Sequence, residues 1–332
     1  MQDLTEESSI RRSEKQAGRL QNSSIQGVML AAGVYFIWGF FPLYFNHLQP
    51  AGSLEVIVHR AFWGLAFCLA VLLYRKKLQL FFQVFKEPKV LWRLACAGFL
   101  IVANWSIYIY AIQHGHTIDA ALGYFINPLF TVLLALLILR EKTRPLQNYA
   151  IAFGVLAVAV LLIGMGRLPW VSIGLPLSFG LYSLVKKEVA HQVDAVVGMS
   201  VETLFVLPFL LMYYLWLLWS KQSSFQILFA EQASSAVIAT HLLLLIGAGI
   251  LTVIPLVMMA QAARFISLGL MGLLQYISPI MQLLIGVFVF HEPSETARWI
   301  GTAIVWLACL CLILDGLIQL RERRKLIRLA RR

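Results

Sequence analysis

The chain has 332 residues, of which 60% are hydrophobic and 13% are charged, and its mean hydropathy is +0.79. A soluble globular chain is about 45–50% apolar and about 25% charged, so a soluble fold could not cover this much apolar surface. The composition therefore excludes a soluble protein and predicts an integral membrane protein. The apolar runs are continuous rather than alternating, which favours spanning helices over the strands of a barrel.

Ten apolar runs follow a polar N-terminal tail, which covers residues 1–26. Each run has close to the roughly 20 residues that cross a bilayer as a helix. A basic C-terminal tail covers residues 320–332. We expect spans at about 27–46, 53–74, 91–112, 117–139, 144–164, 170–187, 196–217, 237–263, 266–290 and 296–319.

The basic residues predict the orientation of these spans. Of the 27 Lys and Arg residues, 23 fall on one side of the ten-span arrangement, three fall on the other, and Arg60 alone lies inside a span. Loops rich in Lys and Arg stay in the cytoplasm, so both termini are expected there. This distribution also explains the net charge of +11 without a nucleic-acid partner.

An internal repeat divides the chain into two halves. Span four contains Tyr124-Phe125-Ile126-Asn127-Pro128, and span nine contains Gln275-Tyr276-Ile277-Ser278-Pro279. The two prolines are 151 residues apart, and so are Glu141 and Glu292, which follow them and are expected to fix loops through ion pairs. Five spans per half invert the second copy relative to the first. The predicted repeats are residues 27–166 and 167–319.

Inverted repeats with broken helices are typical of secondary transporters, whose substrate site lies near the middle of the membrane. Pro128 and Pro279 are expected to break spans four and nine in mid-helix, because each proline removes a donor and frees a carbonyl one turn back. Gly33, Gly39 and Pro42 interrupt span one in a similar way. The pattern predicts transport by alternating access, with the two halves rocking around a central site.

The five-plus-five inverted arrangement, with its proline and Glu motifs, resembles the EamA-type members of the drug/metabolite transporter superfamily. Residues 27–320 carry the resemblance, and several strings are similar to the RarD branch. These are Tyr35-Phe36-Ile37-Trp38-Gly39, His59-Arg60, Asn104-Trp105, Leu122 to Pro128, Glu202-Thr203 and Gln275 to Pro279. The resemblance implies a ten-helix permease of small metabolites or drugs in a bacterial inner membrane, without specifying the substrate.

Arg60 and His59 are the first candidates for a substrate site, since a charge inside a span is costly and needs a reason. They would form an electropositive wall for an anionic or carboxylate-bearing substrate. The alternatives are that Arg60 extends to the outer headgroups or pairs with Glu55.

Glu202 is the candidate for proton coupling, because burial raises the affinity of a carboxylate for protons. Aligning the expected starts of spans two and seven puts Glu202 opposite His59. The alternative is a structural carboxylate that is hydrogen-bonded to Thr203 or to the backbone.

Four polar side chains near the middles of their spans are further candidates for substrate contacts: Asn104, Asn127, Gln275 and Ser278. Trp38, Tyr124 and Tyr276 are expected to supply flat walls for an aromatic or apolar substrate. The alternatives are helix–helix hydrogen bonds for the polar groups and packing for the aromatic ones.

A membrane enzyme acting on lipid or lipid-linked substrates is the alternative function. Its only candidate cluster is His114, His116 and Asp119, which we discount because the loop is too short to build a cleft for catalysis or zinc. The chain has no Gly-Lys-Ser/Thr phosphate loop, so we expect no ATP and no cofactor or metal. The expected partners are a small-molecule substrate and the lipid bilayer, with a monomer or homodimer as the assembly.

Overall fold

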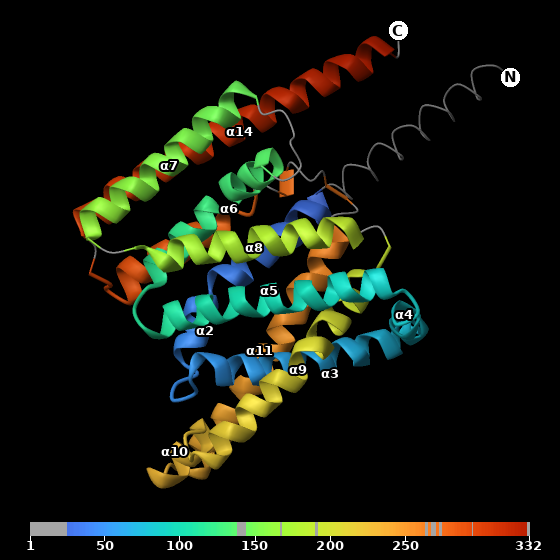
Figure 1. The fold of residues 1–332 in the computed structure, drawn as a ribbon, viewed down its shortest axis with the longest axis vertical. Coiled ribbons are helices and arrows are strands. Elements are labelled where there is room, and N and C mark those ends of the chain that lie inside the picture. The colour runs from blue at the N-terminus through green and yellow to red at the C-terminus, as the bar shows by residue number, and fades with distance from the viewer. Residues whose placement is uncertain are drawn as a thin grey trace, which may run out of the picture.

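The computed structural model describes residues 25–137, 144–166, 168–189, 192–262, 265–266, 270–271, 274–293 and 295–330. Helices make up nearly all of this part of the chain, and no strand occurs in it (Figure 1). The prediction of an all-helical fold is confirmed. Glu141 and the two tails up to residue 24 and from residue 331 lie outside the described residues.

The first helix covers residues 25–39. The others are α2 (Phe41–Asn46), α3 (Ser53–Tyr74), α4 (Leu78–Val84), α5 (Pro88–Gln113), α6 (Thr117–Leu137), α7 (Pro145–Met165), α8 (Trp170–Val189), α9 (Ala195–Trp219), α10 (Ser224–Ala230), α11 (Ser235–Ala262), α13 (Ile277–Leu284), the π-helix η1 (Ile285–Val289) and α14 (Thr296–Ala330).

Seven helical segments of the described chain are long and apolar enough to cross a membrane, which makes this a multi-pass membrane protein. They are Ile25–Asn46, Ser53–Tyr74, Pro88–Gln113, Pro145–Gly164, Ala195–Ala230, Ser235–Ala262 and Thr296–Ile318. Helices also occupy the other three positions where spans are expected, at α6, at α8 and at α13 with η1.

Span nine differs from the expected broken helix. Pro128 lies inside α6, as predicted, but Pro279 lies in the first turn of α13, after a turn at Gln275 and Tyr276. A proline is tolerated in the first turn because that backbone N–H has no partner within the helix. The mid-helix position expected for Pro279 was therefore wrong: the helix begins just before the proline instead of continuing through it.

Helices of the two halves interleave rather than forming two separate bundles. From the second half, α8 packs between α5 and α6 of the first, and α14 lies along α7 (Figure 1). On the other flank α3 packs against both α9 and α11. Contacts between the two halves are therefore spread over both flanks of the bundle.

The two ends of the bundle differ in charge. The basic face is defined here as the end that carries Arg75, Lys76, Lys77, Lys86, Lys89, Arg93 and Lys186. The weakly charged face is the end that carries the connections at residues 47–52, 114–116, 168–169, 220–223 and 290–295, with 294 outside the described chain.

Candidate functional site

Arg60 lies inside the bundle, with 5% of its surface exposed. Its guanidinium carbon sits 4.0 Å from the ring centre of Trp105 on α5, and its Nε donates to the hydroxyl of Thr252 on α11 at 2.6 Å. Such burial excludes an Arg60 that extends to the headgroups. Pairing with Glu55 is excluded as well, because both carboxylate oxygens of Glu55 accept from Ser224.

Aromatic rings surround the Arg60 guanidinium. Phe45 and Phe41 on α2 lie 5.4 and 5.8 Å from its central carbon. Tyr108 packs edge-on against Phe45, and its hydroxyl is buried without a hydrogen-bond partner among the described residues. The ring of Tyr124 lies 5.4 Å from that of Tyr108. We call Arg60, Trp105, Tyr108, Phe41 and Phe45 the arginine cage.

His59 points away from the cage. Its ring contacts Tyr214 and Phe225, with ring centres 5.2 and 6.1 Å apart, and its Nε2 is buried without a partner. His59 and Arg60 therefore do not form one wall, because neighbouring helical residues point about 100° apart.

Glu202 lies in a second buried polar group, near the basic face. Only 1% of its surface is exposed. Its carboxylate pairs with Lys186 and accepts a hydrogen bond from the hydroxyl of Tyr182 at 3.3 Å. Both partners come from α8, so the expected hydrogen bond to Thr203 is not what holds this carboxylate.

The register of Glu202 also differs from the expected one. Asp194 caps α9 by accepting from the Val196 amide, so α9 begins at Ala195, one residue earlier than predicted. Glu202 is then the eighth residue of α9, as Arg60 is the eighth residue of α3. Aligning the observed starts of the two helices therefore puts Glu202 opposite Arg60 rather than His59.

Asn104 joins two helices. Its side-chain nitrogen donates to the Leu175 carbonyl at 2.9 Å and to the Ser178 hydroxyl at 3.0 Å, both on α8. This is the helix–helix bonding that was the alternative to a substrate contact. Asn127 is half-buried on α6, one residue before Pro128.

The span-nine candidates gather around α13. Ser278 is buried and accepts from the side-chain nitrogen of Gln282 at 3.0 Å, and the same nitrogen donates to the Trp38 carbonyl at 3.1 Å. Tyr276 stacks on Phe125 with ring centres 6.3 Å apart, whereas Gln275 is half-buried in the preceding turn. Trp38 and Ser278 therefore belong to one cluster, formed by span one and span nine.

At the weakly charged face, α6 is tied to α14 and to the loop before it. Asp119 forms a buried ion pair with Arg298, at 3.2 Å between Oδ1 and Nε. The carboxylate of Glu292 accepts from the backbone amides of Thr117 and Ile118 at 2.7 and 3.0 Å. A carboxylate there satisfies amides that have no partner within the helix and complements the helix dipole.

At the basic face, further ion pairs connect the two halves. Lys77 pairs with Asp194 at 2.9 Å and Arg93 with Glu188 at 2.6 Å. Partial burial by itself would raise the pKa of Asp194, but the Lys77 ammonium, the Val196 amide and the nearby Arg75 lower it overall. Both faces are thus held by contacts between helices of opposite repeats.

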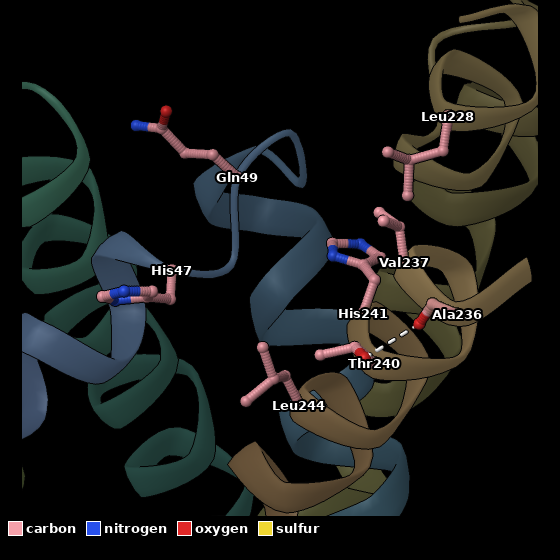
Figure 2. A pocket seen from close by; sticks show the side chains of 8 residues that line it. All are labelled: His47, Gln49, Leu228, Ala236, Val237, Thr240, His241 and Leu244. Carbon is pink, nitrogen blue, oxygen red and sulfur yellow. Dashed lines mark hydrogen bonds between the residues drawn. The ribbon is translucent and has the colours of Figure 1, made fainter. Parts of the chain in front are cut away.

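A pocket of about 290 Å³ opens at the weakly charged face (Figure 2). None of the predicted site residues lines it. Its wall combines the end of α2 with α10 and α11, through His47, Gln49, Leu228, Ala236, Val237, Thr240, His241 and Leu244.

Behind this pocket, His241 approaches the hydroxyl of Ser224 at 3.0 Å, and that hydroxyl also donates to Glu55. Catalytic serine triads place the carboxylate on the histidine. Here the carboxylate binds the serine itself, so the arrangement anchors α10 to α3 instead of activating a nucleophile.

The discounted catalytic cluster is also dispersed. Asp119 is engaged by Arg298, and His114 stacks on Tyr110 with ring centres 4.0 Å apart. His116 approaches Asp119 at 3.3 Å. The described residues contain no group of three metal-ligating side chains. This geometry does not favour the membrane-enzyme alternative.

Sequence reasoning missed several residues of these clusters, among them Trp105, Tyr108, Thr252 and Gln282. Trp105 and Tyr108 lie close to Asn104 on α5, and their helical spacing to it was the available signal. Thr252 and Gln282 carried no signal, because their partners Arg60 and Trp38 are 192 and 244 residues away.

Comparison with known proteins decides the family. The profile described as the EamA-like transporter family matches this chain twice, over residues 25–163 and 169–314. The chain belongs to the EamA-like transporter family.

Relatives within this family point to the RarD branch. The chain is 36% identical over 306 residues to Protein RarD of Streptomyces exfoliatus, covering 92% of this chain and 94% of that protein. It is 32% identical to Protein RarD of Escherichia coli, covering 90% and 98%. An uncharacterized transporter of Pseudomonas aeruginosa is 37% identical, with 90% and 96% covered. The chain is thus a RarD-type EamA membrane transporter.

The fold also has a counterpart among solved structures. One chain of 17% sequence identity superposes with a TM-score of 0.54, covering 87% of this chain and 98% of its own length. At this identity the likeness concerns the fold alone.

Proposed function

We propose that this protein is a secondary transporter of a bacterial inner membrane that moves a small metabolite or drug by alternating access. The proposal includes ten spans in repeats 27–166 and 167–319, two cytoplasmic termini, and a monomer or homodimer in the bilayer, with nucleic acid playing no part. The observation that carries it is the interleaved packing of two inverted repeats, with polar side chains buried where the halves meet.

Contacts between the repeats at opposite faces support alternating access. Asp119 and Arg298 hold α6 to α14 at the weakly charged face. Lys186 with Glu202 lies toward the basic face, where Lys77 with Asp194 also joins the repeats. A route that opens to one side at a time requires one set to separate while the other holds. Because helices of the two halves interleave, the moving bodies combine helices from both repeats.

The candidate substrate region lies between these two sets of contacts. Arg60, with Tyr124 nearby, contributes from the first repeat, and Tyr276 and Ser278 contribute from the second. Pro128 and Pro279 are the proposed hinges, since a proline frees α6 from one internal hydrogen bond and opens α13 at its first turn. Asn127 and Gln275, next to these breaks, remain candidates for substrate contacts.

The test is uptake by purified protein reconstituted in liposomes, using a pooled metabolite extract with and without an imposed pH gradient. We expect protein-dependent accumulation of one class of compound. Accumulation that rises with the gradient indicates proton coupling, whereas equal uptake indicates uniport or exchange. Folded protein that moves nothing in either condition contradicts the proposal.

A second experiment tests alternating access itself. In a chain whose four native cysteines are replaced by alanine, Asp119→Cys and Arg298→Cys are joined by a bismaleimide. Locking α6 to α14 is expected to abolish transport, while the same double variant before cross-linking keeps it. Undiminished transport in fully cross-linked protein contradicts opening at this face.

A further inference from the structure

We propose that the arginine cage binds the charged group of a small monoanionic organic acid, and that this acid is the transported substrate. The inference rests on the proposed transport function and names the chemistry of its substrate. Its starting point is that Arg60 is a buried cation inside a span that has no carboxylate within ion-pair distance in the described part of the chain.

The donor groups of Arg60 are mostly unused. A guanidinium offers five N–H donors. Only Nε has a hydrogen-bond partner among the described residues, the hydroxyl of Thr252. That hydroxyl donates its own proton to the Ala248 carbonyl, so it serves Arg60 as an acceptor. The two terminal nitrogens, which are suited to bind a carboxylate with two parallel bonds, remain available.

The side chains of the cage around Arg60 add a hydrogen-bond donor, the Tyr108 hydroxyl, and none of them is a negatively charged acceptor. The Tyr108 hydroxyl is buried and has no hydrogen-bond partner in the described part of the chain, and its ring bridges Phe45 of the cage to Tyr124. The Trp105 ring covers one face of the guanidinium at 4.0 Å, which stabilises the cation but leaves its N–H edge free. A site rich in donors and lined with rings fits an anion that carries an apolar body.

Arg60 differs from Glu202, which is the buried charged side chain of α9. Glu202 is neutralised by Lys186 and Tyr182 from α8. The residues of α2 around Arg60 are instead Phe41 and Phe45. The fold therefore supplies a counter-ion to Glu202, whereas the described residues supply none to Arg60 and leave it to be neutralised by a ligand.

The single positive charge of Arg60 determines the charge of the favoured ligand. One guanidinium balances one negative charge, whereas a phosphate monoester would leave a second charge unpaired in a site of low dielectric constant, which is costly. Glu202 cannot form an ion pair with Arg60 to change this balance. The Glu202 backbone packs on Gly98 of α5, whereas the Arg60 guanidinium packs on Trp105, seven residues later in the same helix. Seven residues span roughly 10 Å along a helix. The favoured ligand is thus a monocarboxylate.

The test is equilibrium binding of radiolabelled benzoate to the purified full-length chain in detergent, with unlabelled competitors. Benzamide has the shape of benzoate without its charge, hexanoate keeps the charge without the ring, and phenyl phosphate adds a second charge. We expect saturable binding that hexanoate competes for, and that benzamide and phenyl phosphate affect at least about tenfold more weakly. Binding of benzamide or phenyl phosphate as tight as that of benzoate overturns the proposal, as does the absence of saturable binding up to millimolar concentrations.

Variants assign the binding to the cage. Arg60→Gln is expected to weaken benzoate at least about tenfold, and Arg60→Lys to recover part of the loss. Tyr108→Phe, which keeps the ring, is expected to weaken benzoate roughly three- to tenfold without lowering the unfolding temperature. It keeps the test decisive if Arg60→Gln does not fold. Tyr74→Phe, at an exposed tyrosine, is the matched control. Unchanged affinity in folded Arg60 or Tyr108 variants overturns the assignment.

Binding in detergent requires no transport, so the two proposals fail separately. A chain that binds benzoate through Arg60 but moves no solute in liposomes contradicts the transport proposal. A chain that transports solutes but binds benzamide and benzoate alike contradicts the anion site alone.

Discussion

Gly98 on α5 and Gly249 on α11 are 151 residues apart, and each brings its helix into backbone contact with a helix next to it in the bundle. A Cβ on Gly98 would overlap the backbone of Glu202 on α9, and one on Gly249 would overlap Trp63 and Gly64 on α3. The spacing equals that of the two repeat prolines. Inverted symmetry is therefore present in the packing as well as in the proline motifs.

Replacing either glycine by alanine tests this close packing. Gly98→Ala and Gly249→Ala are each expected to destabilise the fold by about 1–3 kcal/mol, the usual cost of overpacking. The measurement is the free energy of unfolding in mixed micelles. Gly316→Ala on α14, where a Cβ meets nothing within 4 Å, is the matched control and is expected to be neutral or slightly stabilising. Equal effects at all three positions would contradict the argument.

The buried pair of Asp119 with Arg298 gives a second prediction. Asp119→Asn leaves the Arg298 guanidinium, 6% exposed, without its charge partner, which typically costs about 3–5 kcal/mol when one member of a buried pair is removed. Asp119→Leu combined with Arg298→Met is expected to recover much of this stability. The measurement is again unfolding in mixed micelles. A double variant less stable than Asp119→Asn would show that the charges themselves are required.

Glu202 gives a prediction on coupling. If its carboxylate carries the coupled proton, Glu202→Gln abolishes the dependence of uptake on a pH gradient while exchange of substrate continues. Combining Glu202→Gln with Lys186→Met also removes the cation that Glu202 neutralises. The double variant therefore separates a loss of proton coupling from the destabilisation that an unpaired ammonium causes. Uptake that depends on the gradient as strongly in folded Glu202→Gln as in the parent chain rules out this coupling site.

Asp194 predicts a pH-dependent contribution to stability at the basic face. The folded-state pKa of Asp194 lies below its usual value, so its ionised form stabilises the fold above the unfolded-state pKa of about 3.9. The contribution is lost as the pH falls through the lower folded-state value. Because the pair is partly exposed, its size should stay within the roughly 0–1 kcal/mol of surface pairs.

Asp194→Asn isolates this charge, since asparagine is an equally good helix cap. The unfolding temperature of the variant should lie below that of the parent chain at neutral pH, and the two should converge below about pH 4. A difference that persists at low pH would mean that the cap, rather than the charge, stabilises α9.

The helix of span nine has a start that the local sequence pattern could not predict. The motif around Pro279 repeats that around Pro128, and equivalent helices were expected, yet α6 runs through its proline whereas α13 begins beside the second one. Identical local chemistry permits both outcomes, because a proline is compatible with a kinked helix and with a first turn. Only packing around each span selects between them.

His114 and Asp119 illustrate the same limit for chemistry. They were part of the only candidate cluster for a membrane enzyme, which was discounted because its loop is short, and Asp119 binds Arg298, which is 179 residues away. Asn104 was one candidate for a substrate contact, and its side-chain nitrogen bonds α8. Such assignments depend on distant partners, which no local pattern contains.

The sequence by itself determined the class of the protein, its helical nature and its repeat, because hydropathy, charge distribution and motif spacing are written along the chain. Tertiary structure decided which polar groups are already satisfied. Glu55, Asn104 and Glu202 have partners from other helices, while most donors of Arg60 have no partner in the part of the chain that the structure describes. The reason is physical: the cost of a buried polar group depends on its partners in space, and helices distant in sequence supply them.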